Sequence, residues 1–360
     1  MKVFLVGGAV RDQLLKLPIN DRDWVIVGAT QEDVQNLLDQ GYQQVGADFP
    51  VFLHPETGEE YALARTERKI ADGYHGFTVS VDPSITIEDD LIRRDVTLNS
   101  MAMTPEGDLV DPYNGLKDLK NKVIRHTSDA FCEDPLRVLR VARFFAKLPD
   151  FKVHESTNEL CNNMCKKGDL DHLSTERFWA ELEKGLSTNR PDKFVAGLYD
   201  LGAASHTQFL SSVFSGDKNH DVQTAKLLQA FDLEDRMVYY VSLISDNEKL
   251  PKCKSEIQTL IKLKKLFYNV DYADASSVFK FLKAAGAYRE GNQFKMFLNL
   301  LAFLERCNKK QKLDHHGLEL MYNSTTGITS KMFPDKTGKD LGMAIDQART
   351  EAIADLISNF

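Results

Sequence analysis

The sequence predicts an α+β head, a mixed sheet with helices, followed by an elongated all-helical remainder. In roughly the first 120 residues, short apolar runs of strand length alternate with helical pieces and turns, which is typical of a sheet covered by helices. From about residue 129, glycine and proline become sparse and apolar residues recur with helical spacing. We therefore expect a head at 1–125, a helical neck at 126–200, and a helical body and tail at 201–360.

The bulk composition narrows the class of protein. A chain of 360 residues is too long for one compact core, and no stretch approaches the roughly 20 apolar residues of a membrane span. The five cysteines are scattered and odd in number, which favours idle thiols in a cytoplasmic protein. The net charge of −8 argues mildly against a nucleic-acid partner, but such binding depends on local basic patches rather than on the total.

The head opens with an apolar run and a glycine pair. Residues 2–6 are expected to form a strand, Gly7 and Gly8 start the turn that follows, and a helix is expected over Gln13–Leu17. Backbone amides at a glycine turn before a helix can cradle a phosphate. Further strands are expected at 23–27, 51–54, 59–65, 77–81 and 108–110.

Two aspartates stand at the start of the second strand. Asp21 and Asp23 are separated by one residue, and alternate side chains of a strand point to the same face. Two neighbouring carboxylates repel each other unless a positive charge lies between them, and a hard divalent cation is the usual one. An ordinary tight turn beside an exposed acid pair is the structural alternative, but the two features together favour nucleotide chemistry.

A second polar cluster occupies residues 88–102. Acidic residues precede a predicted helix that carries Arg93, Arg94, Asp95 and, one turn later, Asn99. Positions four apart share a helix face, so Asp95 and Asn99 could present an acceptor and an amide to one hydroxyl-bearing ligand. A neighbouring arginine could grip a phosphate. The alternative is a solvated helix turn with its own ion pairs.

A third cluster begins at residue 133. Asp134 precedes Pro135, an arrangement that predicts a helix N-terminus, and arginines recur at every third position, as Arg137, Arg140 and Arg143. An aspartate and an arginine one turn later offer the acceptor and two-pronged donor needed to hydrogen-bond the edge of a nucleobase. Alternatively, Asp134 only caps the helix and pairs with Arg137.

Taken in order, these motifs closely resemble those of the bacterial class II CCA-adding enzymes (tRNA nucleotidyltransferases). The resemblance covers about the first 190 residues: Gly-Gly-Ala-Val-Arg-Asp, Asp-Arg-Asp, Arg-Arg-Asp with Asn99, Asp-Pro-Tyr-Asn-Gly at 111–115, Glu-Asp-Pro-Leu-Arg, and Ser-Thr-Glu-Arg-Phe-Trp-Ala-Glu-Leu at 174–182. It implies a DNA polymerase β-like nucleotidyltransferase head followed by helical neck, body and tail domains. Beyond about residue 200 the similarity is weak.

The resemblance also implies a set of site residues. Asp21 and Asp23 would be catalytic and hold Mg²⁺. The nucleotide would be contacted by residues from all three clusters: Gly8, Arg11, Arg94, Asp95, Asn99, Asp134, Arg137, Arg140 and Arg143.

Within this set, the roles differ along the nucleotide. Gly8 and Arg11 would contact the triphosphate, Arg94 would also bind the nucleotide, and Asp95 would read the ribose 2′-hydroxyl. The template that accepts C or A would be Asp134 with Arg137, supported by the two arginines that follow. Finally, Arg177 and Glu181, one turn apart, would brace the neck helix.

The implied function is the template-independent addition of C, C and A to the 3′ end of tRNA, from CTP and ATP. A monomer is expected, and it would recognise the acceptor stem and 3′ end of tRNA by shape and phosphate contacts. One of two lysine clusters, at 262–265 or 309–312, would contribute. The alternatives are a poly(A) polymerase or A-adding enzyme built on the same head, and an inactive RNA-binding relative, which the intact aspartate pair disfavours.

Three further interpretations concern single segments. Some relatives carry a C-terminal phosphohydrolase domain. Here His220-Asp221 lacks ordered His and Asp partners, so we interpret it as a surface pair and the hydrolase as absent or degenerate. Glu60 is a candidate for a third catalytic carboxylate. The segment Asp108–Asn114 resembles the one that hinges between CTP- and ATP-competent states in the family.

Overall fold

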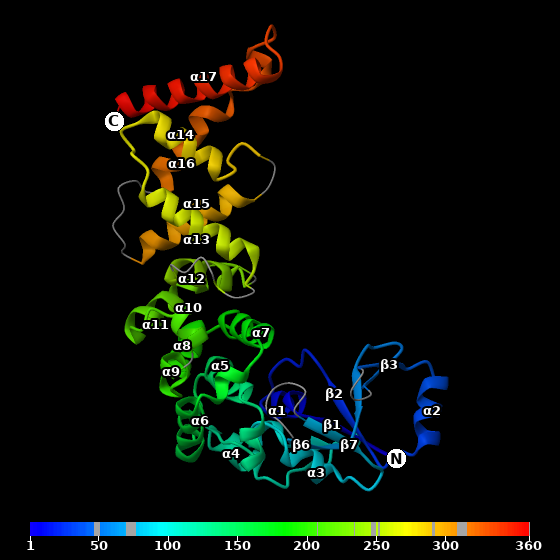
Figure 1. The fold of residues 1–360 in the computed structure, drawn as a ribbon. Coiled ribbons are helices and arrows are strands. Elements are labelled where there is room, and N and C mark those ends of the chain that lie inside the picture. The colour runs from blue at the N-terminus through cyan, green and yellow to red at the C-terminus, as the bar shows by residue number, and fades with distance from the viewer. Residues whose placement is uncertain are drawn as a thin grey trace. The chain divides into compact units, whose positions relative to one another are not determined.

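The computed structural model describes residues 1–360 except 47–50, 70–76, 207, 234, 246–249, 251–252, 290–291, 308–314 and 360 (Figure 1). The chain divides into two compact units, Met1–Leu210 and Ser211–Phe360. The residues expected to form the head and the neck therefore share the first unit, which contains all the predicted site residues.

The first unit is built on a seven-stranded mixed sheet with the strand order β3-β4-β5-β2-β1-β8-β9. β2 pairs antiparallel with β1 and parallel with β5, so the strand that carries Asp23 lies in the middle of the sheet. β6 and β7 form a separate antiparallel pair. The bounds are β1 (Lys2–Val6), β2 (Asp23–Val27), β3 (Gln43–Val45), β4 (Val51–Leu53), β5 (Glu60–Leu63), β6 (Arg65–Lys69), β7 (Phe77–Val81), β8 (Ala102–Met103) and β9 (Leu109–Val110).

The predicted α+β head is confirmed, with local differences. The single strand expected at 59–65 is two strands, β5 and β6, because the chain leaves the sheet where the Arg65 amide turns to the carboxylate of Asp90, at 3.4 Å. The strands β3 and β8 were not expected, since two or three residues are too short to show a period of two.

Helices cover both faces of the sheet. On one face, α1 packs Val10 against Leu5 and α2 packs Leu37 against Phe52. On the other face, α3 buries Leu91 in the core that includes the β2 strand. The elements are α1 (Gly8–Leu14), α2 (Gln31–Asp39), α3 (Ile87–Ile92) and, after α3, the 3₁₀ turn η1 (Thr97–Asn99).

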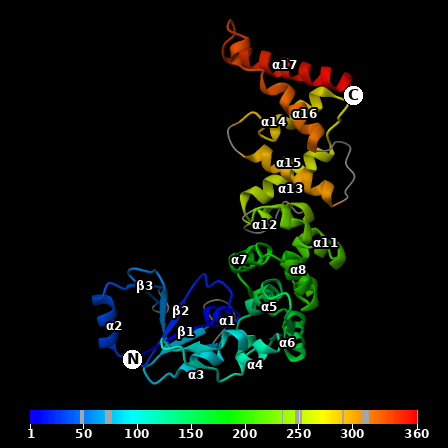
Figure 2. The same cartoon turned by 180° about the vertical axis from the view of Figure 1, so that it is seen from behind.

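The rest of the first unit is mainly helical, as predicted. α5 packs against α7 and α8, the green ribbons of Figure 2. α7 and α8 meet at Gly185, where an added Cβ would lie 2.3 Å from the Phe194 ring. The bounds are α4 (Gly115–Lys120), β10 (Val123–Ile124), η2 (Asp129–Glu133), α5 (Leu136–Lys147), β11 (Lys152–Val153), α6 (Glu155–Lys167), η3 (Asp169–His172), α7 (Thr175–Leu186), α8 (Pro191–Asp200) and α9 (Ala203–His206).

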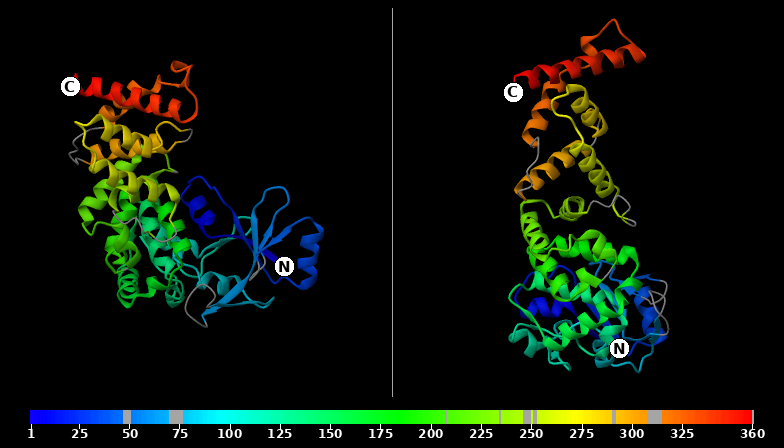
Figure 3. Two further views of the ribbon diagram at one scale, coloured as in Figure 1. Left: turned by 45° about the horizontal axis from the view of Figure 1, so that its top comes forward. Right: turned by 60° about the vertical axis from the view of Figure 1, so that its left-hand side comes forward.

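Among the described residues of the second unit, all regular elements are helices. In its core, the ring of Phe267 lies 5.5 Å from the centroids of both Phe281 and Phe297. The C-terminal helix α17 packs against α14 and α16, which Figure 3 shows in red, yellow and orange, respectively. The bounds are α10 (Gln208–Val213), α11 (Lys218–Leu227), η4 (Leu228–Ala230), α12 (Arg236–Ile244), α13 (Ser255–Tyr268), α14 (Ala275–Ala284), α15 (Gln293–Arg306), α16 (His315–Thr326), η5 (Ser330–Met332) and α17 (Gly338–Ser358).

Within the described part of the chain, no helix combines the length and the apolar character that crossing a membrane requires.

The lysine cluster on α13 is only partly available to RNA. Lys264 is 3% exposed, and its ammonium donates to the carbonyls of Leu243 and Ser245 at 3.0 and 3.1 Å. It therefore satisfies carbonyls at the end of α12, and the expectation that Lys264 contacts tRNA is wrong. Lys262 and Lys265 are exposed. The other cluster, at 309–312, lies outside the described residues.

The interpretation of His220-Asp221 as a surface pair is also wrong for the aspartate. Asp221 is 0% exposed, and its carboxylate accepts hydrogen bonds from the amide and the hydroxyl of Ser215. Asp221 thus fixes the turn that leads into α11, a structural role that a two-residue pattern does not reveal.

Candidate active site

Most of the predicted site residues converge on one pocket of the first unit, with a volume of about 330 Å³. It lies where the end of β1, the start of β2, the end of α3 and the start of α5 meet. Glycines, carboxylates and arginines dominate its lining, which consists of Gly7, Gly8, Asp23, Arg65, Arg93, Arg94, Asp95, Asn99, Asp134, Leu136, Arg137, Arg140 and Arg177. Four predicted residues are not part of this lining: Arg11, Asp21, Arg143 and Glu181.

The glycine pair lets an arginine approach the backbone. Gly7 has a φ of +71°, a conformation that residues with a Cβ rarely adopt. A Cβ at this position would also lie 3.1 Å from Nη1 of Arg94. Glycine is therefore required at this turn both for the backbone conformation and for the position of the guanidinium.

The helix after the glycine pair starts earlier than predicted. α1 spans Gly8–Leu14, whereas the sequence indicated 13–17. Val10 packs into the core, which extends the helix back to the glycines, and Lys16 has a φ of 56°, which ends it because a left-handed residue does not continue a right-handed helix. The backbone amides of the first helical turn consequently begin directly at the pocket.

The two aspartates lie at and just before the start of β2. The strand begins at Asp23, so Asp21 precedes it instead of lying within it. Dehydration by the surrounding protein raises the pKa of Asp23, the Arg94 guanidinium opposes this shift, and the charge of Asp21 adds to it. The two carboxylates are thus close enough to repel each other, and a bound cation would relieve this repulsion.

A third carboxylate projects to the same side of the sheet as Asp23. Glu60 on β5 is the register partner of Asp23 on β2, and directly opposed residues of paired strands share a face. Among the described residues, no three His, Cys, Asp or Glu side chains form a group that could hold a metal ion. A cation here would therefore rely on the aspartate pair together with oxygen atoms of its ligand.

The helix predicted to carry Arg94, Asp95 and Asn99 is not continuous. α3 ends at Ile92, because Val96 leaves the helical path to form a β-bridge, and only the short turn η1 follows. Asp95 and Asn99 nevertheless lie side by side, since Nδ2 of Asn99 donates to Oδ1 of Asp95 at 3.0 Å. The predicted proximity is confirmed although the predicted helix is wrong.

Asp95 is buried and held by several donors. Besides Asn99, the Val96 amide donates to its Oδ1 at 2.9 Å, and Nε and Nη2 of Arg140 donate to its Oδ2 at 2.8 and 2.6 Å. Burial alone would raise the pKa of this carboxyl, but Arg140 and the hydrogen bonds hold the pKa well below its usual range. Asp95 is thus an ionised acceptor at neutral pH.

Arg11 is buried behind the glycine pair, at 3% exposure. Its Nε and Nη2 donate to the two carboxylate oxygens of Asp12 at 2.8 and 2.9 Å, and its Nη1 donates to Oδ1 of Asn99 at 2.6 Å. Because arginine can only donate, this bond turns Nδ2 of Asn99 toward Asp95. Lys147, in the last turn of α5, also contacts Asp12, at 2.9 Å, which joins α1 to α5.

The start of α5 brings Asp134 and Arg137 to the pocket, each with partners in the protein. Asp134 accepts from the Leu136 amide at 3.1 Å, as a capping residue does, and from Nη2 of Arg177 at 2.8 Å. Arg137 is 8% exposed and donates to two backbone carbonyls. Both side chains that would read a base therefore already have protein partners.

The helices α5 and α7 are joined by two charged pairs. Nε of Arg143 donates to the carboxylate of Glu181, which is 3% exposed. One turn earlier on α7, Arg177 contacts Asp134. These pairs fix the position of α5, so Arg143 and Glu181 act on the pocket through the helix and not as part of its lining.

Sequence reasoning missed several residues of this region. Arg65 lines the pocket, Asp90 forms ion pairs with Arg93 and Arg94, and Lys147 pairs with Asp12. Asp90 stands four residues before Arg94, a helical spacing that indicates an ion pair and could have revealed it. Arg65 and Lys147 arrive from other elements, and no local pattern places them here.

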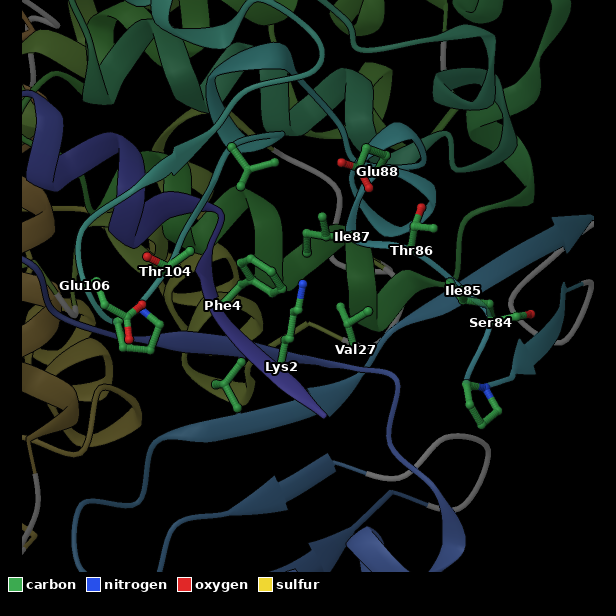
Figure 4. Close-up of a pocket in the computed structure, with 14 residues that line it drawn as sticks. Lys2, Phe4, Val27, Ser84, Ile85, Thr86, Ile87, Glu88, Thr104 and Glu106 are labelled. Atoms are coloured by element: carbon green, nitrogen blue, oxygen red, sulfur yellow. The ribbon is translucent and has the colours of Figure 1, made fainter.

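A larger cavity, of about 860 Å³, lies elsewhere in the first unit. Figure 4 shows Lys2, Phe4 and Val27 on one side of it and Ile87 and Glu88 on the other. Its lining includes one lysine, two glutamates and no arginine, so it lacks the clustered donors that a triphosphate needs. The smaller, arginine-rich pocket is the better candidate for nucleotide chemistry.

Two protein-family models match this chain. The poly A polymerase head domain matches residues 3–125, which include the glycine pair, both aspartates and α3. The probable RNA and SrmB-binding site of polymerase A matches residues 150–208. The first model, which also describes poly(A) polymerases, agrees with the predicted nucleotidyltransferase head but does not by itself separate C and A addition from A addition.

Relatives that match along the full chain distinguish CCA addition from the addition of A alone. The CCA-adding enzymes of two Coxiella burnetii strains, RSA 331 and RSA 493, are each 39% identical to this chain and cover 99% of it and 96% of their own length. A solved Thermotoga maritima CCA-adding enzyme, complexed with tRNA, matches with a TM-score of 0.67 and 21% identity, over 99% of this chain and 91% of that one. A CCA-adding enzyme in an apo form gives a TM-score of 0.68 at 21% identity, with 99% and 91% covered.

At such low identity the solved structures establish the fold alone, a mixed-sheet head followed by a helical remainder. The relatives at 39% identity, which match 99% of the chain, establish more: this protein belongs to the CCA-adding enzymes, the tRNA nucleotidyltransferases that its motifs predicted.

Proposed function

We propose that this enzyme adds C, C and A to the 3′ end of tRNA from CTP and ATP, and selects each nucleotide with its own side chains. The pocket is the observation that supports assigning this activity to particular residues. Groups suited to phosphates (Gly8, Arg94), to a ribose (Asp95) and to a base edge (Asp134, Arg137) line one cavity.

Asp21 and Asp23 are assigned to Mg²⁺. Carboxylate oxygens are the hard ligands that this ion prefers, and the Asp21 charge that helps raise the pKa of Asp23 is the repulsion that a cation removes. When bound there, Mg²⁺ supplies activation of the tRNA 3′-hydroxyl and neutralisation of charge on the triphosphate. Glu60, opposite Asp23 in the sheet, is proposed as an additional carboxylate at the edge of this site.

The triphosphate is assigned to the glycine turn and Arg94. The Arg94 side chain is 20% exposed, and its Nη1 faces the turn at Gly7. Arg11 lies behind Gly8, where an added Cβ would be 3.3 Å from its Nη2. Its charge supports the phosphate site from behind, and direct contact with the triphosphate, as the sequence predicted, requires Arg11 to exchange its bond with Asn99.

The ribose is assigned to one hydrogen-bond acceptor, and the base is assigned to one acceptor and one donor. Asp95, ionised and fixed by Arg140, accepts a hydrogen bond from the 2′-hydroxyl, which distinguishes ribonucleotides from deoxyribonucleotides. Asp134 accepts from the exocyclic amino group that cytosine and adenine share, and Arg137 donates to the base. Uracil and guanine present a carbonyl oxygen in place of that amino group, which the Asp134 carboxylate repels.

The RNA partner is assigned to tRNA, bound by a cytoplasmic monomer at the acceptor stem and 3′ end. The match of residues 150–208 to an RNA-binding family model supports a contact surface in the neck, where Lys166 and Lys167 of α6 are exposed. On α13, the exposed Lys262 and Lys265 are the members of the predicted cluster that can reach a phosphate.

The test is the extension of a tRNA that lacks its CCA end, with Mg²⁺, CTP and ATP, resolved at single-nucleotide steps. We expect a product that stops after C, C and A. A long ladder of A, or A added only to a tRNA that already ends in CC, would replace the proposal by poly(A) or A addition.

The metal assignment is tested in the same assay. Asp21→Ala and Asp23→Ala should abolish extension, whereas Asp39→Ala, which removes an exposed carboxylate of α2, should leave it unchanged. Incorporation at the wild-type rate by both site variants would refute the assignment of Mg²⁺ to this pair.

A further inference from the structure

We propose that Asp90, a buried carboxylate of α3, is the positioning residue that aims Arg94 at the phosphate side of the pocket. The proposal rests on the role in triphosphate binding assigned to Arg94. Asp90 is not part of the pocket lining, and it acts through the arginine that is.

Asp90 is surrounded by donors. It is 0% exposed; its Oδ2 accepts from Nη2 and Nε of Arg94 at 2.9 and 3.3 Å, and its Oδ1 accepts from Nη2 of Arg93. The Arg65 amide lies 3.4 Å from the same Oδ1. Burial alone would raise the pKa of Asp90, but Arg94 and Arg93 hold the pKa below its usual value, so the carboxylate is charged.

These contacts fix which edge of the Arg94 guanidinium faces the pocket. A guanidinium presents its N–H groups in a rigid fork, and the Nε and Nη2 edge of Arg94 is occupied by Asp90. The remaining nitrogen, Nη1, is the atom that approaches Gly7, 3.1 Å from the position of an added Cβ. Asp90 therefore leaves only the Nη1 side of Arg94 to meet a phosphate at the glycine turn.

The arrangement needs an acceptor on both carboxylate oxygens. One oxygen serves Arg93 and the other serves Arg94, so an asparagine, with one acceptor and one donor group, cannot serve both. Arg93 keeps a second anchor, because its Nε donates to the Arg65 carbonyl at 3.1 Å. The Nε and Nη2 edge of Arg94, in contrast, is held by Asp90. Removing Asp90 should therefore disturb the orientation of Arg94 more than that of Arg93.

The first unit contains a second buried aspartate that resembles Asp90 and can serve as a control for a purely structural role. Asp118 is 4% exposed and accepts from Nε and Nη2 of Arg125 at 2.9 and 3.2 Å. Neither residue lines the pocket. Asp118→Ala is therefore the matched control, since it removes a buried carboxylate with the same type of arginine contact, and its further bond, from Oγ1 of Thr97 at 2.8 Å, does not involve Arg94.

The experiment is a double-mutant cycle on nucleotide use, with tRNA ending in its discriminator base, Mg²⁺ and CTP. Asp90→Ala should lower kcat/KM for CTP by at least 10-fold and leave KM for tRNA within 2-fold of wild type. Arg94→Ala should lower kcat/KM by at least as much, and adding Asp90→Ala to it should change kcat/KM by less than 2-fold. Asp118→Ala should lower Tm but keep kcat/KM within 3-fold of wild type.

The outcomes separate the proposals. If Asp90→Ala leaves kcat/KM undiminished, the positioning role is overturned while the role of Arg94 stands. The same holds if Asp90→Ala lowers kcat/KM by the same factor in the wild type and in Arg94→Ala. An undiminished kcat/KM for Arg94→Ala refutes the role proposed for Arg94, and the positioning role with it. If Asp90→Ala does not fold, Asp90→Asn takes its place in the cycle, with a smaller loss expected in the same direction and the same dependence on Arg94.

Discussion

Replacing Arg140 by methionine should destabilise the first unit, because Asp95 would stay buried without its cation. Removing one partner of a buried ion pair costs about 3–5 kcal/mol. Asn99 and Val96 still donate to Asp95 in the variant, and the Arg140 side chain is itself 36% exposed, so we expect the lower end, about 3 kcal/mol. For a unit of this size, roughly 2–4 °C of Tm accompanies each kcal/mol, so Tm should fall by roughly 6–12 °C.

The pH dependence of this loss identifies its cause. In the wild type the folded-state pKa of Asp95 is depressed, so its stabilisation is fully present above the unfolded pKa of about 3.9 and is lost only as the pH falls below it. In Arg140→Met, burial is no longer opposed by the guanidinium, so the folded pKa rises and protonation on acidification relieves the penalty. The Tm difference between the two proteins should therefore shrink from pH 7 to pH 5.

Scanning calorimetry of both proteins at the two pH values measures these differences. As a control, Asp95→Asn added to Arg140→Met should recover part of the lost Tm, since it removes the unpaired charge while keeping the shape of the side chain. A Tm loss that is the same at both pH values, or the absence of any loss, would show that Arg140 does not neutralise a buried carboxylate.

Three other predictions concern the surroundings of the pocket. Gly7→Ala and Gly58→Ala should strain the backbone equally, because both glycines have a φ near +70°. Only Gly7→Ala should raise KM for CTP, because nothing lies within 4 Å of an added Cβ at Gly58. Equal KM values for the two variants would contradict this prediction. Asp12→Asn and Lys147→Met should be coupled by about 0.5–1 kcal/mol in a double-mutant cycle of urea denaturation, and strict additivity would contradict their contact. Millimolar Mg²⁺ should raise the Tm of the wild type, reversibly with EDTA, and a similar rise in Asp23→Asn would argue against that ligand.

Local patterns in the sequence were sufficient for elements whose signal is contained in a few neighbouring residues. The strand before Gly7, the aspartate that opens β2, and the helix that begins after Asp134 are all present where spacing and capping placed them. The helix expected through Asp95 is absent, because a β-bridge at Val96 competes with the helical spacing and is invisible in the local sequence.

Contacts between distant segments could not be predicted from such patterns. Lys147 and Asp12 meet although 135 residues separate them, and the charge of each is ordinary in its own segment. Lys264 is a second example. Its neighbours Lys262 and Lys265 are exposed, but Lys264 is buried because its ammonium donates to carbonyls at the end of another helix. Burial of a charge depends on what packs against it, which a single sequence does not state.

The existing partners of Asp134 and Arg137 have a consequence for fidelity under the base-reading role proposed for these two residues. Because Asp134 is bonded to Arg177 and Arg137 to backbone carbonyls, an incoming base does not simply add hydrogen bonds but exchanges them. A correct base returns as many bonds as it displaces, so its binding energy comes largely from stacking and from its phosphates. A wrong base leaves a buried donor or acceptor unsatisfied, at a cost of about 1–3 kcal/mol for each group. In that role, the two residues would reject a wrong base more strongly than they reward a correct one.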